Sequence, residues 1–124
     1  MTQFPQMQAF IADWFARFDR LDPVDAFLPD LHPDVIWDMP DIDSSLHGHD
    51  RFRAWYATVL STFTPPITHR LSDIHITENE VRFTVEMHAN LLNGAPVQIT
   101  AKEHWRYSLT AAGTPQITHY TVEI

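Results

Sequence analysis

Apolar residues in the first part of the chain recur at the three- and four-residue spacing of an amphipathic helix. Within residues 4–18 this repeat builds one apolar stripe from Phe4, Met7, Phe10, Ile11, Trp14, Phe15 and Phe18. Asp22 and Pro23 have the residue types of an N-cap and a first helical position, which predicts a short helix ending near Pro29. A short strand over 34–38, stopped by Pro40, and a loop over 41–45 follow.

A second long amphipathic segment begins after His49, and its apolar face carries Phe52, Trp55, Tyr56, Val59, Leu60 and Phe63. Pro65-Pro66 is expected to end this helix, because proline cannot continue the backbone hydrogen-bond pattern. The apolar period then changes to two, which predicts strands over 67–76, 81–91, 97–109 and 117–124. Leu71 and Ile74 are out of phase, which predicts a bulge, and Asn93-Gly94 predicts a hairpin turn.

Helices that precede a long antiparallel meander predict an α+β fold, with the helices packed on the apolar face of one curved sheet. Alternation along 97–109 places Ala101, Glu103 and Trp105 on that apolar face. Glu103 is therefore an acid expected to point toward the helices rather than toward water.

The composition narrows the classes of partner. The chain has 124 residues, no cysteine, 8 Lys and Arg against 16 Asp and Glu, and a formal net charge of −8. An acidic surface repels phosphate backbones and anionic headgroups, so neither a nucleic acid nor a membrane is expected as a partner. Without cysteine there is no disulfide scaffold and no thiol nucleophile. No signal peptide or membrane span is apparent, and we expect one cytoplasmic domain over residues 1–124.

Several loose motifs together resemble one superfamily over essentially the whole chain. They are Leu21-Asp22 with Asp25, the run 32–40 (HPDVIWDMP), the run 48–56 (GHDRFRAWY) and Trp105-Arg106-Tyr107. The pattern is similar to the nuclear-transport-factor-2-like superfamily, in its SnoaL-like branch. The resemblance implies a cystatin-like α+β barrel, in which a cone-shaped curved antiparallel sheet packs around N-terminal helices. It also implies an apolar pocket at the open end and a homodimer formed through the outer sheet face.

The superfamily includes ketosteroid isomerase, scytalone dehydratase, SnoaL-like polyketide cyclases, epoxide hydrolases and non-enzymatic transport factors, so the fold alone does not assign a function. The strand around Glu103 resembles the isomerase strand in which a protonated Asp helps to hold a substrate oxyanion. A buried Glu can stay neutral and donate a hydrogen bond, or act as a general acid or base. The alternative is a Glu paired with a buried His, Tyr or Trp for structural reasons.

Asp38 lies near the position of the isomerase base, but matching on the following proline places Met39 at that position. A methionine cannot abstract a proton, and alternation turns Trp37 and Met39 to one face and Asp38 to the other. Asp38 therefore reaches the pocket only if a bulge turns it inward; otherwise it is a solvent-facing strand end.

His69 lies where scytalone dehydratase has one of its two catalytic histidines, and Asp22 matches the catalytic Asp of that enzyme. Leu21 and Val85 stand where the dehydratase has its Tyr and its second His, so half of that set is missing. The ordinary alternatives are Asp22 as a helix cap and His69 as a hydrogen-bonded sheet histidine.

The aromatic and apolar residues expected to line the pocket, or else to be simple core, are Trp14, Trp37, Trp55, Tyr56, Phe83, Met87, Trp105 and Tyr120. His47-Gly48-His49 with Asp50 lacks a spaced third ligand, and residues 41–52 lack the glycine and closing Glu of a calcium loop, so we expect no metal.

Two classes of function remain open. The first is cofactor-free acid/base chemistry (isomerisation, cyclisation, dehydration or hydration) on a small apolar, cyclic compound, with Glu103 as the acid/base or oxyanion donor and His69 or Asp38 as its partner. The second is a non-catalytic ligand-binding protein, or a dimeric protein-interaction module of the same fold.

Overall fold

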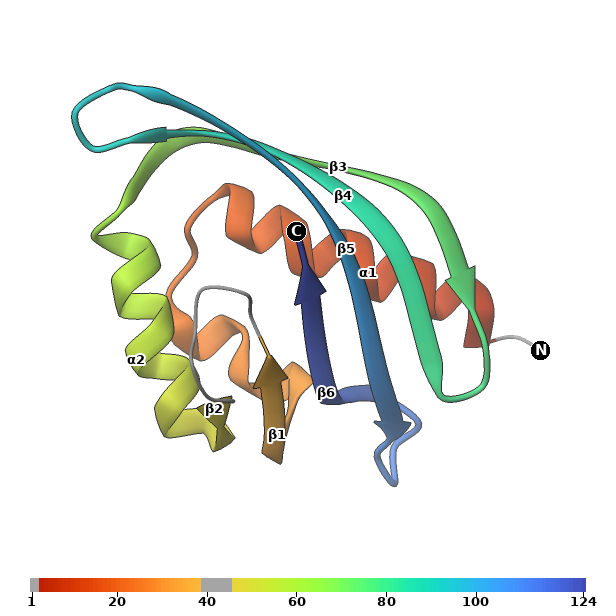
Figure 1. The fold of residues 1–124 in the computed structure, drawn as a ribbon. Coiled ribbons are helices and arrows are strands. Elements are labelled where there is room, and N and C mark those ends of the chain that lie inside the picture. Colours follow the sequence, from red (N-terminus) through yellow and green to blue (C-terminus); the bar gives the residue numbers. More distant parts are fainter. Residues whose placement is uncertain (1–2, 39–45) are drawn as a thin grey trace.

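The computed structural model describes residues 3–38 and 46–124 (Figure 1). Its elements are α1 (Gln3–Asp19), the short 3-10 helices η1 (Val24–Ala26) and η2 (Leu28–Asp30), β1 (Leu31–Asp38), β2 (Leu46–His47), α2 (Gly48–Leu60), β3 (Phe63–Ile76), β4 (Glu80–Leu91), β5 (Pro96–Leu109) and β6 (Pro115–Glu123). Met39, Pro40 and the predicted loop 41–45 lie outside the described residues. No helix in the described part of the chain is long and apolar enough to cross a membrane.

The six strands form one sheet in the order β2-β1-β6-β5-β4-β3. Strands β3 to β6 form the predicted antiparallel meander, whereas β1 pairs in parallel with β6, which makes the sheet mixed. Figure 1 shows β3, β4 and β5 bending over α1, with α2 beside them at the end of the molecule that holds the β4–β5 hairpin. The α+β architecture, with helices inside a curved sheet, is therefore as predicted.

The predicted irregularity in β3 is a bulge. The register with β4 shifts between Ser72 and His75, and Asp73 in between has a φ of 53°. The extra residue brings Leu71 and Ile74 both to the core side, where they are partly buried against it. The Asn93-Gly94 turn is also confirmed, since Gly94 has a φ of 90° and donates its N–H to the carbonyl of Leu91.

Two local predictions were wrong. Helix α2 ends at Leu60, and Pro65-Pro66 lie within β3 instead of closing the helix. Prolines are tolerated there because β3 is an edge strand whose pairing with β4 shifts between Thr64 and Thr68. Asp22 does not cap a helix either; Pro23 precedes η1, and no side chain caps it.

The core forms around the apolar stripe of α1. Trp14 is fully buried, and its ring lies 5.1 Å from that of Phe27, 5.9 Å from that of Trp105 and 6.2 Å from that of Trp37 (centroid to centroid). Edge-to-face and tilted contacts of this kind add to the free energy gained by removing aromatic surface from water. The predicted helical stripe thus packs against residues from both β1 and β5 on the concave face of the sheet.

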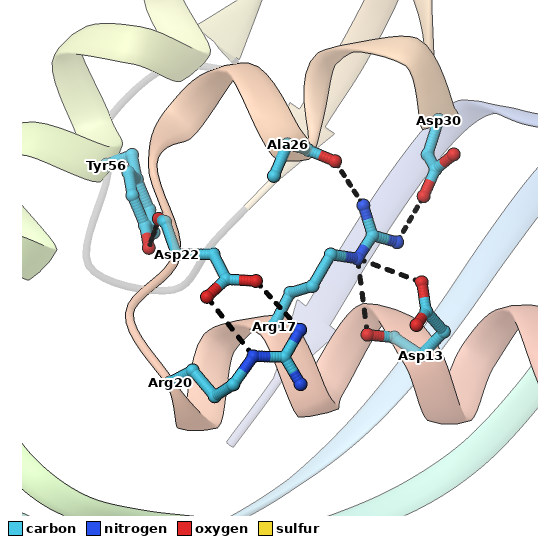
Figure 2. Close-up of polar contacts among 7 residues, drawn as sticks. All are labelled: Asp13, Arg17, Arg20, Asp22, Ala26, Asp30 and Tyr56. Carbon is cyan, nitrogen blue, oxygen red and sulfur yellow. Dashed lines mark hydrogen bonds and ion pairs between the residues drawn. The ribbon is translucent and has the colours of Figure 1, made fainter.

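Arg17 is a buried cation of α1 whose guanidinium lies over the rings of Trp14 and Phe27, where it holds the η1–η2 segment (Figure 2). Its guanidinium donates to the backbone carbonyl of Ala26 and to Asp30, and its Nε lies 3.0 Å from an Asp13 carboxylate oxygen. Burial raises the pKa of Asp30, and the Arg17 charge opposes that shift. The ionised form of Asp30 therefore depends on Arg17.

We expect Arg17→Met to lower the free energy of unfolding by about 3 kcal/mol, because it leaves a half-buried carboxylate and a backbone carbonyl without their donor. Adding Asp30→Asn should recover a large part of that loss, since the orphaned charge is then gone. Urea unfolding of the two variants measures both changes. An equal loss in the single and the double variant would show that Arg17 acts through packing alone.

Candidate functional site

A cavity of about 440 Å³ lies between the two helices and the concave face of the sheet. Residues of α1, α2 and of strands β1 and β3–β6 line it, and most of them are apolar. The size falls within the range of small-molecule sites in proteins. Apart from the indoles of Trp37 and Trp55, its polar lining consists of Thr58, Thr62, His69, Glu103 and Tyr120.

Glu103 points into the protein from the middle of β5, as alternation predicted. Glu103 is 7% exposed, and it pairs in register with Phe83 of β4 and Val122 of β6. Trp105, two residues along on the same face, donates its Nε1–H to Glu103 Oε1 over 3.1 Å. Tyr120 of β6 is the second hydrogen-bond partner of this carboxyl.

Burial raises the pKa of Glu103 to about 7, and the hydrogen bonds from Tyr120 and Trp105 oppose that rise. Burial, together with the neighbouring Glu103 charge, raises the pKa of Tyr120 well above its usual value. At neutral pH the carboxyl is therefore present both as acid and as carboxylate, and the phenol keeps its proton. Such a carboxyl is suited to proton transfer near pH 7.

His69 reaches the same cavity from β3. Its Nδ1 lies 2.6 Å from Oδ1 of Asp19, the last residue of α1. Burial lowers the pKa of His69, whereas the hydrogen bond and charge of Asp19 raise it. A carboxylate can only accept, so Nδ1 carries the hydrogen when the ring is neutral, and Nε2 is left as the acceptor.

The structure does not bring Asp38 to this cavity. Its carboxylate lies 2.8 Å from Nε2 of His119, and the side chain is 38% exposed, whereas its neighbour Trp37 is buried and lines the cavity. Alternation over residues 35–38 produces this arrangement, because the register shift of β1 lies earlier in the strand, between Leu31 and Ile36. Asp22 is also outside the cavity; its carboxylate pairs with Arg20, and its carbonyl accepts a bond from Tyr56 (Figure 2).

The predicted apolar lining divides into two groups. Trp37, Trp55, Met87 and Tyr120 line the cavity. The other four are absent from its lining: Trp14, Tyr56, Phe83 and Trp105. Tyr56 donates to the Asp22 carbonyl over 2.5 Å, and Trp105 acts on the site through its bond to Glu103.

Sequence reasoning missed Phe15 and Phe18 of α1 as cavity residues, and Asp19 as the partner of His69. The helical stripe contained the signal for the two phenylalanines, because residues three apart share a helix face. Nothing in the local sequence pairs Asp19 with a histidine fifty positions away.

Among the described residues no group of three or more His, Asp or Glu side chains is arranged to hold a metal ion. His49, one of the histidines weighed as a ligand, has its Nε2 2.8 Å from the Leu31 carbonyl.

The profile of the SnoaL-like domain family matches residues 11–122. The chain belongs to this family. A comparison with curated proteins finds no match. Solved structures that resemble the chain include proteins named as members of the nuclear-transport-factor-2-like superfamily, as the motifs predicted.

Three solved structures illustrate the likeness. An NTF2-like protein of unknown function from Burkholderia pseudomallei is 18% identical, with a TM-score of 0.76 and coverage of 94% of this chain and 88% of that one. A ketosteroid isomerase-like protein from Erwinia carotovora is 15% identical, with a TM-score of 0.74 and coverage of 93% and 90%. The epoxide hydrolase/cyclase-like enzyme SalBIII is 16% identical, with a TM-score of 0.78 and coverage of 99% and 93%. At these identities the likeness concerns the fold.

The raised pKa of Glu103 predicts a pH-dependent stability. Below about pH 4.5 the carboxyl is protonated in both states; between that pH and about 7 the unfolded chain ionises first, so the native state loses stability as pH rises. The full loss is about 3 kcal/mol. We expect Glu103→Gln to remove this loss. In urea unfolding, the free energy of unfolding of the variant should therefore rise relative to that of the wild type between pH 5 and pH 8.

Glu123→Gln, at an exposed position at the end of β6, makes the same chemical change and serves as the control. Its difference from the wild type should stay constant over the same pH range. A constant difference for Glu103→Gln as well would mean that Glu103 ionises in the folded protein as it does in water.

Asp19→Asn tests the tautomer of His69. An amide can donate to Nδ1, so the ring hydrogen should move to Nε2, and loss of the carboxylate charge should lower the pKa of His69 further. The ¹⁵N shifts of the two ring nitrogens and their titration report both effects, with Asp22→Asn as a matched control at a carboxylate paired with Arg20 outside the cavity. Unchanged shifts in Asp19→Asn would show that Asp19 does not set the tautomer.

Proposed function

We propose that the protein binds a small, mostly apolar molecule in the cavity and transfers protons on it without a cofactor, with Glu103 as the proton-carrying group. The observation that carries this proposal is the buried Glu103 carboxyl in an apolar cavity, held by Trp105 and Tyr120 and with a pKa of about 7. The apolar walls exclude water, which strengthens the few polar contacts inside.

The reaction step follows from the two forms of the carboxyl. The ionised form takes a proton from a carbon next to a substrate carbonyl; the C–H bond breaks, and its electron pair moves to the carbonyl oxygen as an enolate. Tyr120 O–H is bonded to the Glu103 carboxylate before the transfer, and it donates to the enolate oxygen once the carboxyl has taken up the proton. The protonated Glu103 then returns the proton to the same carbon or to another one, which gives exchange or isomerisation.

His69 supplies the second proton-accepting group, held by Asp19. The two groups lie on different strands, His69 on β3 and Glu103 on β5, with β4 between them, and the Phe15 ring is 4.9 Å from that of His69 and 6.0 Å from that of Trp105. Glu103 and His69 therefore act on different ends of a bound molecule rather than on one atom. Among the similar structures, one is named as ketosteroid isomerase-like and another acts in pyran ring formation, which is in keeping with chemistry on cyclic compounds.

A second candidate function is ligand binding without turnover. It is favoured by the bonds that Glu103 already makes with Trp105 and Tyr120, since these satisfy the carboxyl without any substrate.

Proton exchange on a model ketone separates the two functions. We expect the protein to accelerate exchange of the methylene protons of deoxybenzoin in D₂O, followed by ¹H NMR, and Glu103→Gln to reduce that rate by about 100-fold or more. Glu123→Gln, outside the cavity, should keep the wild-type rate. Binding of the ketone with no exchange above the buffer rate would favour the non-catalytic function, and an unchanged rate in Glu103→Gln would remove Glu103 from the chemistry.

The homodimer implied by the fold would use the outer face of the sheet. That face carries charges of both signs, among them Glu80 and Glu86 of β4 and Lys102 and Arg106 of β5. Mixed charge is suited to a self-complementary contact between two copies.

A further inference from the structure

The polar groups of the cavity gather at two separate ends. Glu103 and Tyr120 form one end, on β5 and β6, and His69 with Asp19 forms the other, between β3 and α1. The wall between them is apolar and includes Phe15, Val85, Met87, Ile99 and Ala101. A ligand that fills the cavity therefore meets polar protein atoms at both ends of an apolar body.

The Glu103 end is a hydrogen-bond donor. Trp105 Nε1 can only donate, so Glu103 Oε1 is the acceptor in that bond, and the neutral carboxyl keeps its own O–H for another partner. The neutral Glu103–Tyr120 pair holds two O–H hydrogens, and the bond between the two residues uses one of them. Whichever residue donates in that bond, one O–H hydrogen remains for a ligand.

Trp37 adds to this surplus of donors. Its ring stacks on that of Tyr120 with centroids 3.7 Å apart, and within residues 3–38 and 46–124 its buried Nε1–H has no hydrogen-bond partner. The protein groups gathered here lack an acceptor rather than a donor. A carbonyl oxygen is the ligand group that supplies one to the free O–H of the Glu103–Tyr120 pair, whereas Trp37 Nε1 is buried behind the cavity surface.

The His69 end is a hydrogen-bond acceptor. Asp19 takes the Nδ1 hydrogen and burial keeps the ring neutral, so Nε2 presents a lone pair. The cavity-lining hydroxyls of α2 and its C-terminal turn add no donor, because Thr58 donates to the Ala54 carbonyl and Thr62 donates to the Thr58 carbonyl. A ligand hydroxyl is the group that this end lacks.

The separation of the two ends limits the length of the ligand. The contacts of Phe15 place the His69 ring at most about 11 Å from the Trp105 ring, whose indole holds Glu103. This upper limit is compatible with two oxygens on opposite sides of one aromatic ring, each with one hydrogen bond to the protein.

Building on the function proposed above, we infer that the cavity takes an apolar, ring-containing molecule with a carbonyl on one side of a ring, bound at Glu103 and Tyr120, and a hydroxyl on the opposite side, bound at His69. The structure thus distinguishes the two ends of its ligand by hydrogen-bond polarity. A ligand with this polarity reversed, or with only one of the two groups, leaves a buried polar group of the protein unpaired.

Four probes of almost the same size isolate each contact: 4-hydroxybenzophenone, benzophenone, 4-hydroxydiphenylmethane and diphenylmethane. They carry both groups, the carbonyl, the hydroxyl and neither, on a body of about 15 non-hydrogen atoms, which a cavity of this size accommodates. Titration calorimetry or quenching of tryptophan fluorescence gives their dissociation constants. We expect each group to tighten binding by about fivefold to tenfold in the wild type.

Two variants assign the ends. In His69→Phe, which keeps an aromatic ring beside Phe15, the gain from the hydroxyl should vanish while the gain from the carbonyl stays. In Glu103→Leu the gain from the carbonyl should vanish while the gain from the hydroxyl stays, and Tyr120→Phe repeats this test if Glu103→Leu does not fold. His88→Phe, at an exposed histidine on the outer sheet face, should change neither gain.

The outcomes separate this inference from the function on which it rests. An undiminished hydroxyl gain in His69→Phe overturns the two-ended ligand, while loss of the carbonyl gain in Glu103→Leu still supports binding at Glu103. A carbonyl gain that Glu103→Leu and Tyr120→Phe leave intact removes Glu103 from ligand binding and overturns both. Equal affinity for all four probes, or binding of none of them, also overturns the two-ended ligand.

Discussion

The candidate site depends on the burial of one carboxyl group, that of Glu103, among aromatic rings. Glu103 occupies a position on β5 where alternation demands an apolar side chain, and the sheet cannot turn it outward without also turning Ala101 and Trp105 to solvent. Trp105 and Tyr120 supply hydrogen bonds that make this burial tolerable, but no cation among the described residues is shown to pair with it. The free energy of ionising Glu103 is therefore raised, and for that reason the carboxyl can hold or release a proton near neutral pH.

Arg17 shows the opposite solution to the same problem in this fold. There a buried guanidinium is matched with Asp13, Asp30 and a backbone carbonyl, so its polar atoms are paired within the chain. Arg17 contacts only groups that hold the fold together, and it does not line the cavity. The contrast indicates that burial alone does not make a site. A site needs a buried group whose hydrogen-bonding capacity the fold leaves incomplete, next to open space.

Much of the fold could be predicted from the sequence, because periodicity reports directly on which side of an element meets the core. It placed Glu103 inside, Asp38 on the face opposite Trp37, and a bulge near Leu71 and Ile74. Tertiary context decided the rest. Pro65-Pro66 could join β3 only because that strand is at the edge of the sheet, and the parallel pairing of β1 with β6 joins segments about eighty residues apart. The Asp19–His69 pair has the same origin, since it forms only when α1 lies across β3.

The helical stripe of α1 explains why the interior contains both a core and a cavity. Met7, Ile11 and Trp14 are fully covered by the sheet and by neighbouring elements, whereas Phe15 and Phe18, one turn further along, face open space between α1 and α2. Because the strands bend over α1, the sheet is close to the helix at one end and farther from it at the other (Figure 1). Apolar residues of one helical stripe thus fill the interior where the sheet is close to α1 and line the cavity where the sheet is farther from it. The polar residues Glu103, Tyr120 and His69 line the same cavity, where packing leaves room for a second molecule.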